Sequence, residues 1–158
     1  MNRKVRRNVF ETNSSSTHSF SYGGTYNDLI VNDFDNCVHT NLGEFGWEVE
    51  TYFDSTSKLA YILVAAASLT GHSFWCYDNF EEELESFKNT KEYQEIEEVV
   101  KRNMNCDGIV IKDKSEGYID HQSIEYRSFN AWLEDTGADS VENFIFGSIV
   151  LHTDNDNY

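Results

Sequence analysis

Apolar and polar residues alternate over several short stretches of this chain, and a period of two is typical of half-buried β-strands. Residues 47–53 show this alternation most clearly. Gly23 and Gly24 favour a hairpin after the strand at residues 17–22, and residues 114–117 favour a turn between two later strands. The strands predicted in this way cover residues 3–10, 17–22, 29–31, 37–39, 47–53, 107–112, 118–122 and 148–153.

The middle of the chain has the apolar pattern of helices. Residues 58–69 are apolar on nearly all sides, which predicts a buried helix. Residues 54–57 supply side chains that can cap its first turn, and Gly71 is a natural stop. Residues 79–102 predict two helices separated near Asn89 and Thr90, each with one apolar face and one acidic face. An acidic face of this kind is most simply a solvated helix surface.

Two shorter helices are expected near the end of the chain. One begins after Ser128 and ends at Gly137, and the other begins after Ser140. Strands and helices in this order predict an α+β fold with a mostly antiparallel sheet packed around one buried central helix and with acidic surface helices. The length of 158 residues predicts a single domain over residues 1–158.

Charge is distributed unevenly along the chain and limits its partners. The formal net charge is −16, and four of the twelve basic residues lie within residues 3–7. The rest of the chain therefore has eight basic and 28 acidic side chains. Such a body repels nucleic acid and anionic membranes, which disfavours direct DNA binding, whereas it suits a basic protein surface.

The cysteines and the apolar segments indicate a cytoplasmic protein. Cys37, Cys76 and Cys106 are far apart and form no Cys-x-x-Cys pair, so we expect reduced thiols rather than a zinc knuckle. The basic N-terminus lacks the apolar run of a signal peptide. Residues 59–67, the longest apolar run, are too short to span a bilayer.

Three polar clusters coincide with the ends of predicted strands, where scaffolds often hold functional groups. They cover residues 11–18, 120–123 and 152–156. If the fold assembles them, histidines and carboxylates would surround a divalent metal such as Zn, Mn or Fe, which would activate water as in a hydrolase or phosphoesterase. The candidate metal ligands are His18, Asp120, His121, His152 and Asp154, and the candidate catalytic residues are His18, Asp120 and His121.

A second mechanism needs no metal. The hydroxyls of Ser14, Ser15, Ser16 and Thr17, with loop amides, would hold a phosphate while a histidine acts as acid or base. Glu11 would position one of these groups. ADP-ribosyl transfer is a further alternative, because residues 15–17 and 122–125 are similar to the Ser-Thr-Ser and Gln/Glu-x-Glu elements that would bind NAD. Gln122 and Glu125 are, however, one residue farther apart than the second element requires.

Each of these clusters also has a plainer interpretation. His18 can be a hydrogen-bonded loop residue, and Asp120 and His121 can be a solvent-facing pair on a strand. Residues 14–16 can simply form turns. Asp154 lies near the end of the chain, where disorder is the simplest expectation.

Three short motifs resemble a known group of sequences. Residues 9–19, which read Val-Phe-Glu-Thr-Asn-Ser-Ser-Ser-Thr-His-Ser, together with residues 118–123 and 154–157, resemble uncharacterised proteins of phages and Gram-positive bacteria. The resemblance implies a phage or mobile-element setting, and so the cytoplasm of a host cell, and it implies no particular activity.

Two functions follow from these observations. The first is a small accessory protein whose Ser/Thr/His/Asp site binds or processes a phosphate-bearing ligand, most simply a nucleotide. The alternative is a non-enzymatic acidic inhibitor that imitates the charge of DNA and blocks a host defence or nucleic-acid-handling protein. The first predicts that His18, Asp120 and His121 share a pocket, and the second predicts a contiguous acidic face.

Overall fold

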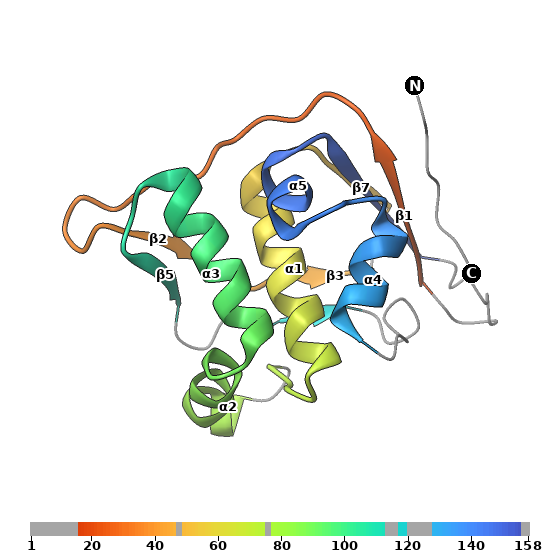
Figure 1. Ribbon diagram of the computed structural model, residues 1–158. Helices are drawn as coiled ribbons and strands as arrows, with labels where there is room; N and C mark the ends of the chain where they lie inside the picture. Colours follow the sequence, from red (N-terminus) through yellow and green to blue (C-terminus); the bar gives the residue numbers. More distant parts are fainter. Residues whose placement is uncertain (1–15, 47–48, 75–76, 113–116, 120–127, 156–158) are drawn as a thin grey trace.

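The computed structural model describes residues 16–46, 49–74, 77–112, 117–119 and 128–155, with the backbone alone at residues 16–18, 77, 154 and 155 (Figure 1). The helices are α1 Ser55–Leu69, α2 Phe80–Lys88, α3 Lys91–Met104, α4 Phe129–Thr136 and α5 Val141–Phe146, with a 3-10 turn at Tyr77–Asn79. The strands are β1 Ser16–Tyr22, β2 Cys37–Thr40, β3 Glu44–Phe45, β4 Glu50–Tyr52, β5 Gly108–Ile111, β6 Tyr118–Ile119 and β7 Ile149–Asn155.

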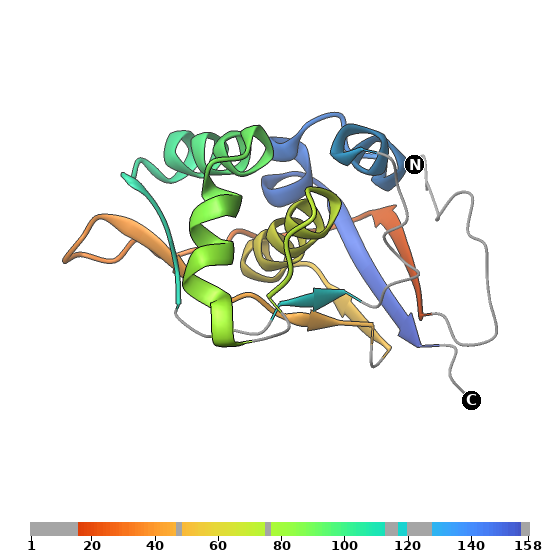
Figure 2. The same cartoon turned by 90° about the horizontal axis from the view of Figure 1, so that it is seen from below.

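The largest sheet is antiparallel, with strand order β1-β7-β4. β1 pairs with β7 from Ser16 opposite Asn155 to Tyr22 opposite Ile149. Figure 2 shows α1, α3, α4 and α5 on one side of this sheet. Helices packed on antiparallel strands confirm the predicted α+β class.

Two further strand pairs are parallel, and this corrects the predicted hairpins. β5 pairs with β2, and β6 pairs with β3, so β5 and β6 are not partners of one another. After β1 the chain also leaves the sheet, since residues 29–31 form only a bridge at Val31 with Val38. Turn-forming residues show where a chain reverses, but they do not determine which strand it meets next.

Helix α1 begins where the sequence predicts. The Asp54 carboxylate accepts a hydrogen bond from the Ser57 amide at 2.8 Å, which caps the first turn. Eleven of the fifteen residues of α1 are buried. The helix lies between the strands β3, β4 and β6 and the helices α3 and α5 (Figure 2). It ends at Thr70, and Gly71 follows with a φ of +80°.

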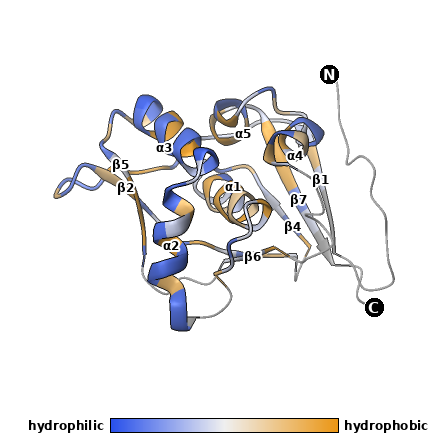
Figure 3. Ribbon diagram, turned by 60° about the horizontal axis from the view of Figure 1, so that its bottom comes forward, coloured by the Kyte–Doolittle hydropathy of each residue, from blue (hydrophilic) through white to orange (hydrophobic). Residues whose placement is uncertain are grey.

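The predicted break between the two acidic helices is confirmed. Thr90 joins them, because its hydroxyl donates to the carbonyl of Phe87 at 2.7 Å and accepts from the amide of Tyr93 at 3.2 Å. The apolar face of α2 is buried, and its other face is hydrophilic (Figure 3). The buried residues of the two helices are Phe80, Leu84, Phe87, Tyr93, Ile96, Val99 and Val100.

The last two helices also follow the sequence prediction. Ser128 caps α4 by accepting from the amide of Ala131, and Ser140 caps α5 by accepting from the amide of Asn143, each at 3.1 Å. Gly137 ends α4 with a φ of +91°, a conformation that glycine adopts without strain.

Cys37 and Cys106 are free thiols, Cys37 half-buried and Cys106 buried, whereas Cys76 lies outside the described residues. Among the described residues, no helix has the length and apolar character needed to cross a membrane.

Candidate functional site

The pairing of β1 with β7 brings two of the three polar clusters together. In this register Thr17 lies opposite Asp154, and His18 lies opposite Thr153. The backbones of residues 16–18 and 153–155, which belong to the N-terminal and C-terminal clusters, are therefore adjacent at one end of the sheet. The expectation of disorder at Asp154 was wrong, because its backbone is part of β7.

In this region the structure describes the side chain of His152. Hydroxyl groups from both neighbouring strands hold its imidazole ring. Its Nε2 lies 2.8 Å from the Ser21 Oγ of β1. Its Nδ1 lies 3.2 Å from the Thr51 Oγ1 of β4. A neutral imidazole donates at one nitrogen and accepts at the other, and a hydroxyl can do either, so both contacts are satisfied in either tautomer.

These contacts bear on the predicted metal role of His152. A metal ion would take the lone pair of one ring nitrogen, so it would have to displace either Ser21 or Thr51. Within the part of the chain that the structure describes, no group of three or more His, Cys, Asp or Glu side chains could hold a metal ion.

The side chains of the other predicted site residues are not described. Ser14, Ser15, Asp120 and His121 lie outside the described residues, as do Glu11, Gln122, Glu125 and Asp156. Ser16, Thr17, His18 and Asp154 are placed by their backbones in β1 and β7. The structure thus joins the first cluster to the third, and the middle cluster stays a prediction.

Ser21 and Thr51 are site residues that the sequence did not reveal. Ser19 and Ser21 alternate with Phe20 and Tyr22, which is a signal that β1 has one polar face. The contact of Ser21 with His152 depends on strand register across 131 positions of sequence, and nothing local determines that register.

A second polar feature is the acidic outer face of α2. Asp78, Glu81, Glu82 and Glu85 are exposed. Lys88 is the basic residue of this helix, and no ion pair found among the described residues involves any of these five side chains. Because these carboxylates have no ion-pair partner among the described residues, this end of the molecule carries a concentrated negative charge.

A third feature is a carboxylate–imidazole pair that joins the loop before β2 to β2 itself. The Asp35 Oδ2 lies 2.6 Å from the His39 Nε2. The hydrogen bond with His39 lowers the pKa of Asp35 below its usual range. Burial raises the pKa of the neighbouring Cys37 thiol, and the charge of Asp35 adds to this effect, which disfavours the thiolate form.

These features define an α+β protein with a polar strand end and an acidic helical face. No protein-family model, no curated protein and no solved structure matches this chain.

Proposed function

We propose that the paired ends of β1 and β7 form the binding site for a phosphate-bearing ligand, most simply a nucleotide. The observation that supports this function is the register that aligns residues 16–18 with residues 153–155. It makes residues of hydroxyl, imidazole and carboxylate type neighbours on adjacent strands. Hydroxyls of residues 14–17 would donate to phosphate oxygens, and His18 or His152 would act as acid or base.

Charge makes a divalent cation part of this proposal. A protein with a formal charge of −16 repels a phosphate unless a positive group lies between them. Asp120, His121 and Asp154 are the residues we expect to hold such a cation beside the hydroxyls. The cation would neutralise the phosphate and lower the pKa of a bound water, which is the chemistry of a metal-dependent hydrolase or phosphoesterase.

Thermal unfolding with and without ligands tests this function. We expect Mn, Zn or Mg together with a nucleotide from a panel to stabilise the protein by ~3 kcal/mol at a hundredfold excess over the dissociation constant. The substitutions His18→Ala and His152→Ala should each abolish that stabilisation. The control is His39→Ala, because His39 lies on β2, outside the antiparallel sheet.

If no combination of metal and nucleotide raises the midpoint of thermal unfolding, the proposed function is contradicted. A stabilisation that His39→Ala removes as completely as His152→Ala would also contradict it, because the effect would not depend on this end of the sheet. Ser21→Ala should leave the fold intact but weaken ligand binding, since Ser21 orients the His152 ring.

The unneutralised face of α2 favours the acidic inhibitor as a second candidate. On this proposal Glu81, Glu82 and Glu85 occupy the phosphate-binding surface of a basic host protein. The protein should then displace fluorescent duplex DNA from at least one member of a panel of DNA-binding proteins. Reversing all three charges to lysine should raise the concentration needed by more than about tenfold, and an unchanged displacement would count against this candidate.

A further inference from the structure

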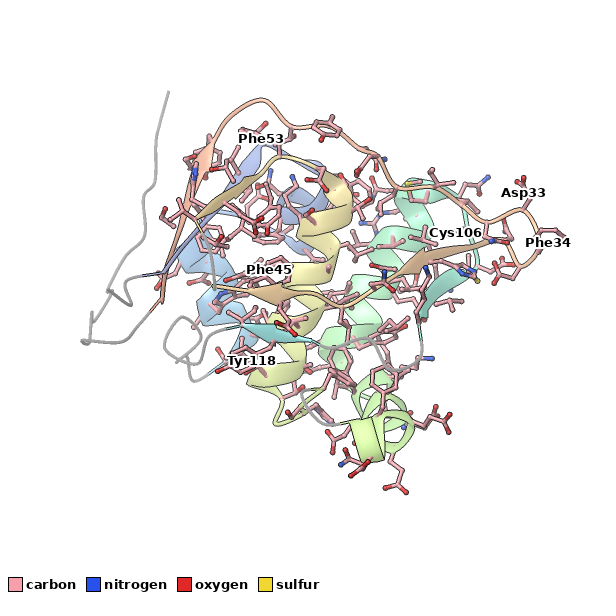
Figure 4. All side chains as sticks on the ribbon, turned by 180° about the vertical axis from the view of Figure 1, so that it is seen from behind. Asp33, Phe34, Phe45, Phe53, Cys106 and Tyr118 are labelled. Carbon is pink, nitrogen blue, oxygen red and sulfur yellow. The ribbon has the colours of Figure 1, made fainter. Side chains whose placement is uncertain are left out.

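The loop between β1 and β2 presents a fully exposed aromatic side chain. Phe34 lies at its tip with 100% of its surface exposed, and Ile30 on the same loop is 79% exposed. Figure 4 shows Asp33 and Phe34 at the end of a projection that points away from the helices. A single exposed apolar residue is ordinary, but Phe34 lies on a hydrogen-bonded tip between two carboxylates.

Hydrogen bonds hold the tip in one conformation. The Phe34 amide donates to the Asn32 Oδ1 at 2.8 Å, and the Asn36 amide donates to the Asn32 carbonyl at 2.9 Å. Asn36 has a φ of +54°, which closes the turn. The Asp107 amide donates to the Asn36 carbonyl at 2.7 Å and ties the loop to the segment before β5. Because these bonds already fix the backbone of the tip, its binding would cost little backbone conformational entropy.

The surroundings of Phe34 are acidic. Asp33 and Asp35 flank it, Asp28 lies earlier in the same loop, and all three are exposed. Residues 8–57 contain no lysine or arginine. The tip therefore combines an apolar side chain with exposed carboxylates, of which Asp35 is paired with His39. An apolar residue with polar neighbours is the arrangement of a central anchor with a polar rim.

The charge identifies the kind of partner. A second copy of this chain would bring an equally acidic loop against the first, and nucleic acid or an anionic membrane would be repelled in the same way. A basic protein surface removes this repulsion. We infer that the tip at residues 30–36 is a docking element that inserts Phe34 into an apolar pocket on a basic protein, with Asp33 and Asp35 facing its cationic rim.

This surface is separate from the proposed ligand site. The tip and the paired ends of β1 and β7 lie on opposite sides of the molecule in Figures 1 and 2. Docking through this tip does not require the phosphate-binding function, and it uses a surface other than α2 for a protein partner.

Selection of short random peptides displayed on phage against the immobilised full-length protein tests the inference. We expect the enriched peptides to combine lysine or arginine with a large apolar side chain. Phe34→Ala should weaken their binding by at least about tenfold, as for an interface anchor. The matched control is Val49→Ala, because Val49 is 70% exposed but lies next to β4. Since the Phe34 side chain is fully exposed, its removal should leave the circular dichroism spectrum unchanged.

Several outcomes would overturn the inference. These are failure to enrich any peptide, enrichment of peptides without basic residues, and binding that Phe34→Ala leaves intact. Binding abolished by charge reversal at Glu81 and Glu82 but not by Phe34→Ala would assign the interaction to α2. A dimer detected by sedimentation and lost in Phe34→Ala would make a second copy the occupant. Ligand-dependent stabilisation by metal and nucleotide should be the same in Phe34→Ala and the parent protein, so the two proposals fail independently.

Discussion

Replacing Tyr61 by alanine is expected to lower the free energy of unfolding by about 3–5 kcal/mol. Tyr61 is fully buried in α1. Its ring centroid lies 6.2 Å from that of Phe20, 4.9 Å from Phe45, 6.1 Å from Trp132 and 6.4 Å from Phe144. These four rings come from β1, β3, α4 and α5, so the truncation would open a cavity where several elements meet.

Urea unfolding followed by tryptophan fluorescence measures this effect. A loss of that size is a large part of the ~5–15 kcal/mol that stabilises a typical domain. Tyr61→Phe is the matched control, because it keeps the ring that fills the space. A loss below ~1 kcal/mol for the alanine variant would show that the aromatic cluster does not stabilise the fold as its burial implies.

The helices of this protein were predictable because their signals are local. Asp54, Thr90, Ser128 and Ser140 each cap the helix that follows, and each cap lies within three residues of the amide that it binds. The apolar faces of α2 and α3 also follow from the spacing of residues along the chain. Such signals remain readable without any knowledge of the tertiary structure.

The strand partners were not predictable because they depend on contacts between distant residues. β2 and β5 form a parallel pair although Cys37 and Gly108 are 71 positions apart in the printed sequence. The order β1-β7-β4 likewise joins the two ends of the chain. Glycines and short polar runs suggested local hairpins, and the pairing that buries the apolar faces prevailed over them.

The same limit explains how much of the candidate site could be predicted. The sequence identified the cluster that ends at His18 and the cluster that begins at His152 as polar, and the structure aligns them on adjacent strands. It could not identify Ser21 and Thr51 as the hydroxyls that hold His152, since that requires the register of three strands. It also drew no attention to Phe34, because exposure depends on the fold.

The second large effect is expected at Lys58, a cation enclosed by the fold. The Lys58 side chain is 0% exposed, and its Nζ donates to the carbonyl of Gly147 at 3.1 Å. Burial lowers the pKa of Lys58 from 10.5 to about 8, and the nearby charge of Asp54 opposes this effect only in part. The unfolded chain therefore holds this proton more tightly than the folded chain does.

The sign of the pH dependence follows from that difference. Between pH 8 and 10.5 the unfolded state binds more protons at this position, so the contribution of Lys58 to stability increases as the pH rises through this window. Below pH 8 the full cost of burying the ammonium remains. Burial also raises the pKa of Tyr93, and this acts in the opposite direction above about pH 10, where an unfolded tyrosine ionises.

Lys58→Met should consequently stabilise the protein by about 1–2 kcal/mol at pH 7. The lowered pKa corresponds to at most ~3 kcal/mol, and loss of the hydrogen bond to Gly147 removes about 1 kcal/mol of that gain. Urea unfolding at pH 7 and at pH 9.5 should show the advantage shrinking at the higher pH. Lys91→Met, which removes an exposed charge, should change stability by less than ~0.5 kcal/mol. A methionine variant less stable than the parent at pH 7 would instead mean that the hydrogen bond of the ammonium to Gly147 and its attraction to the charge of Asp54 outweigh the cost of its burial.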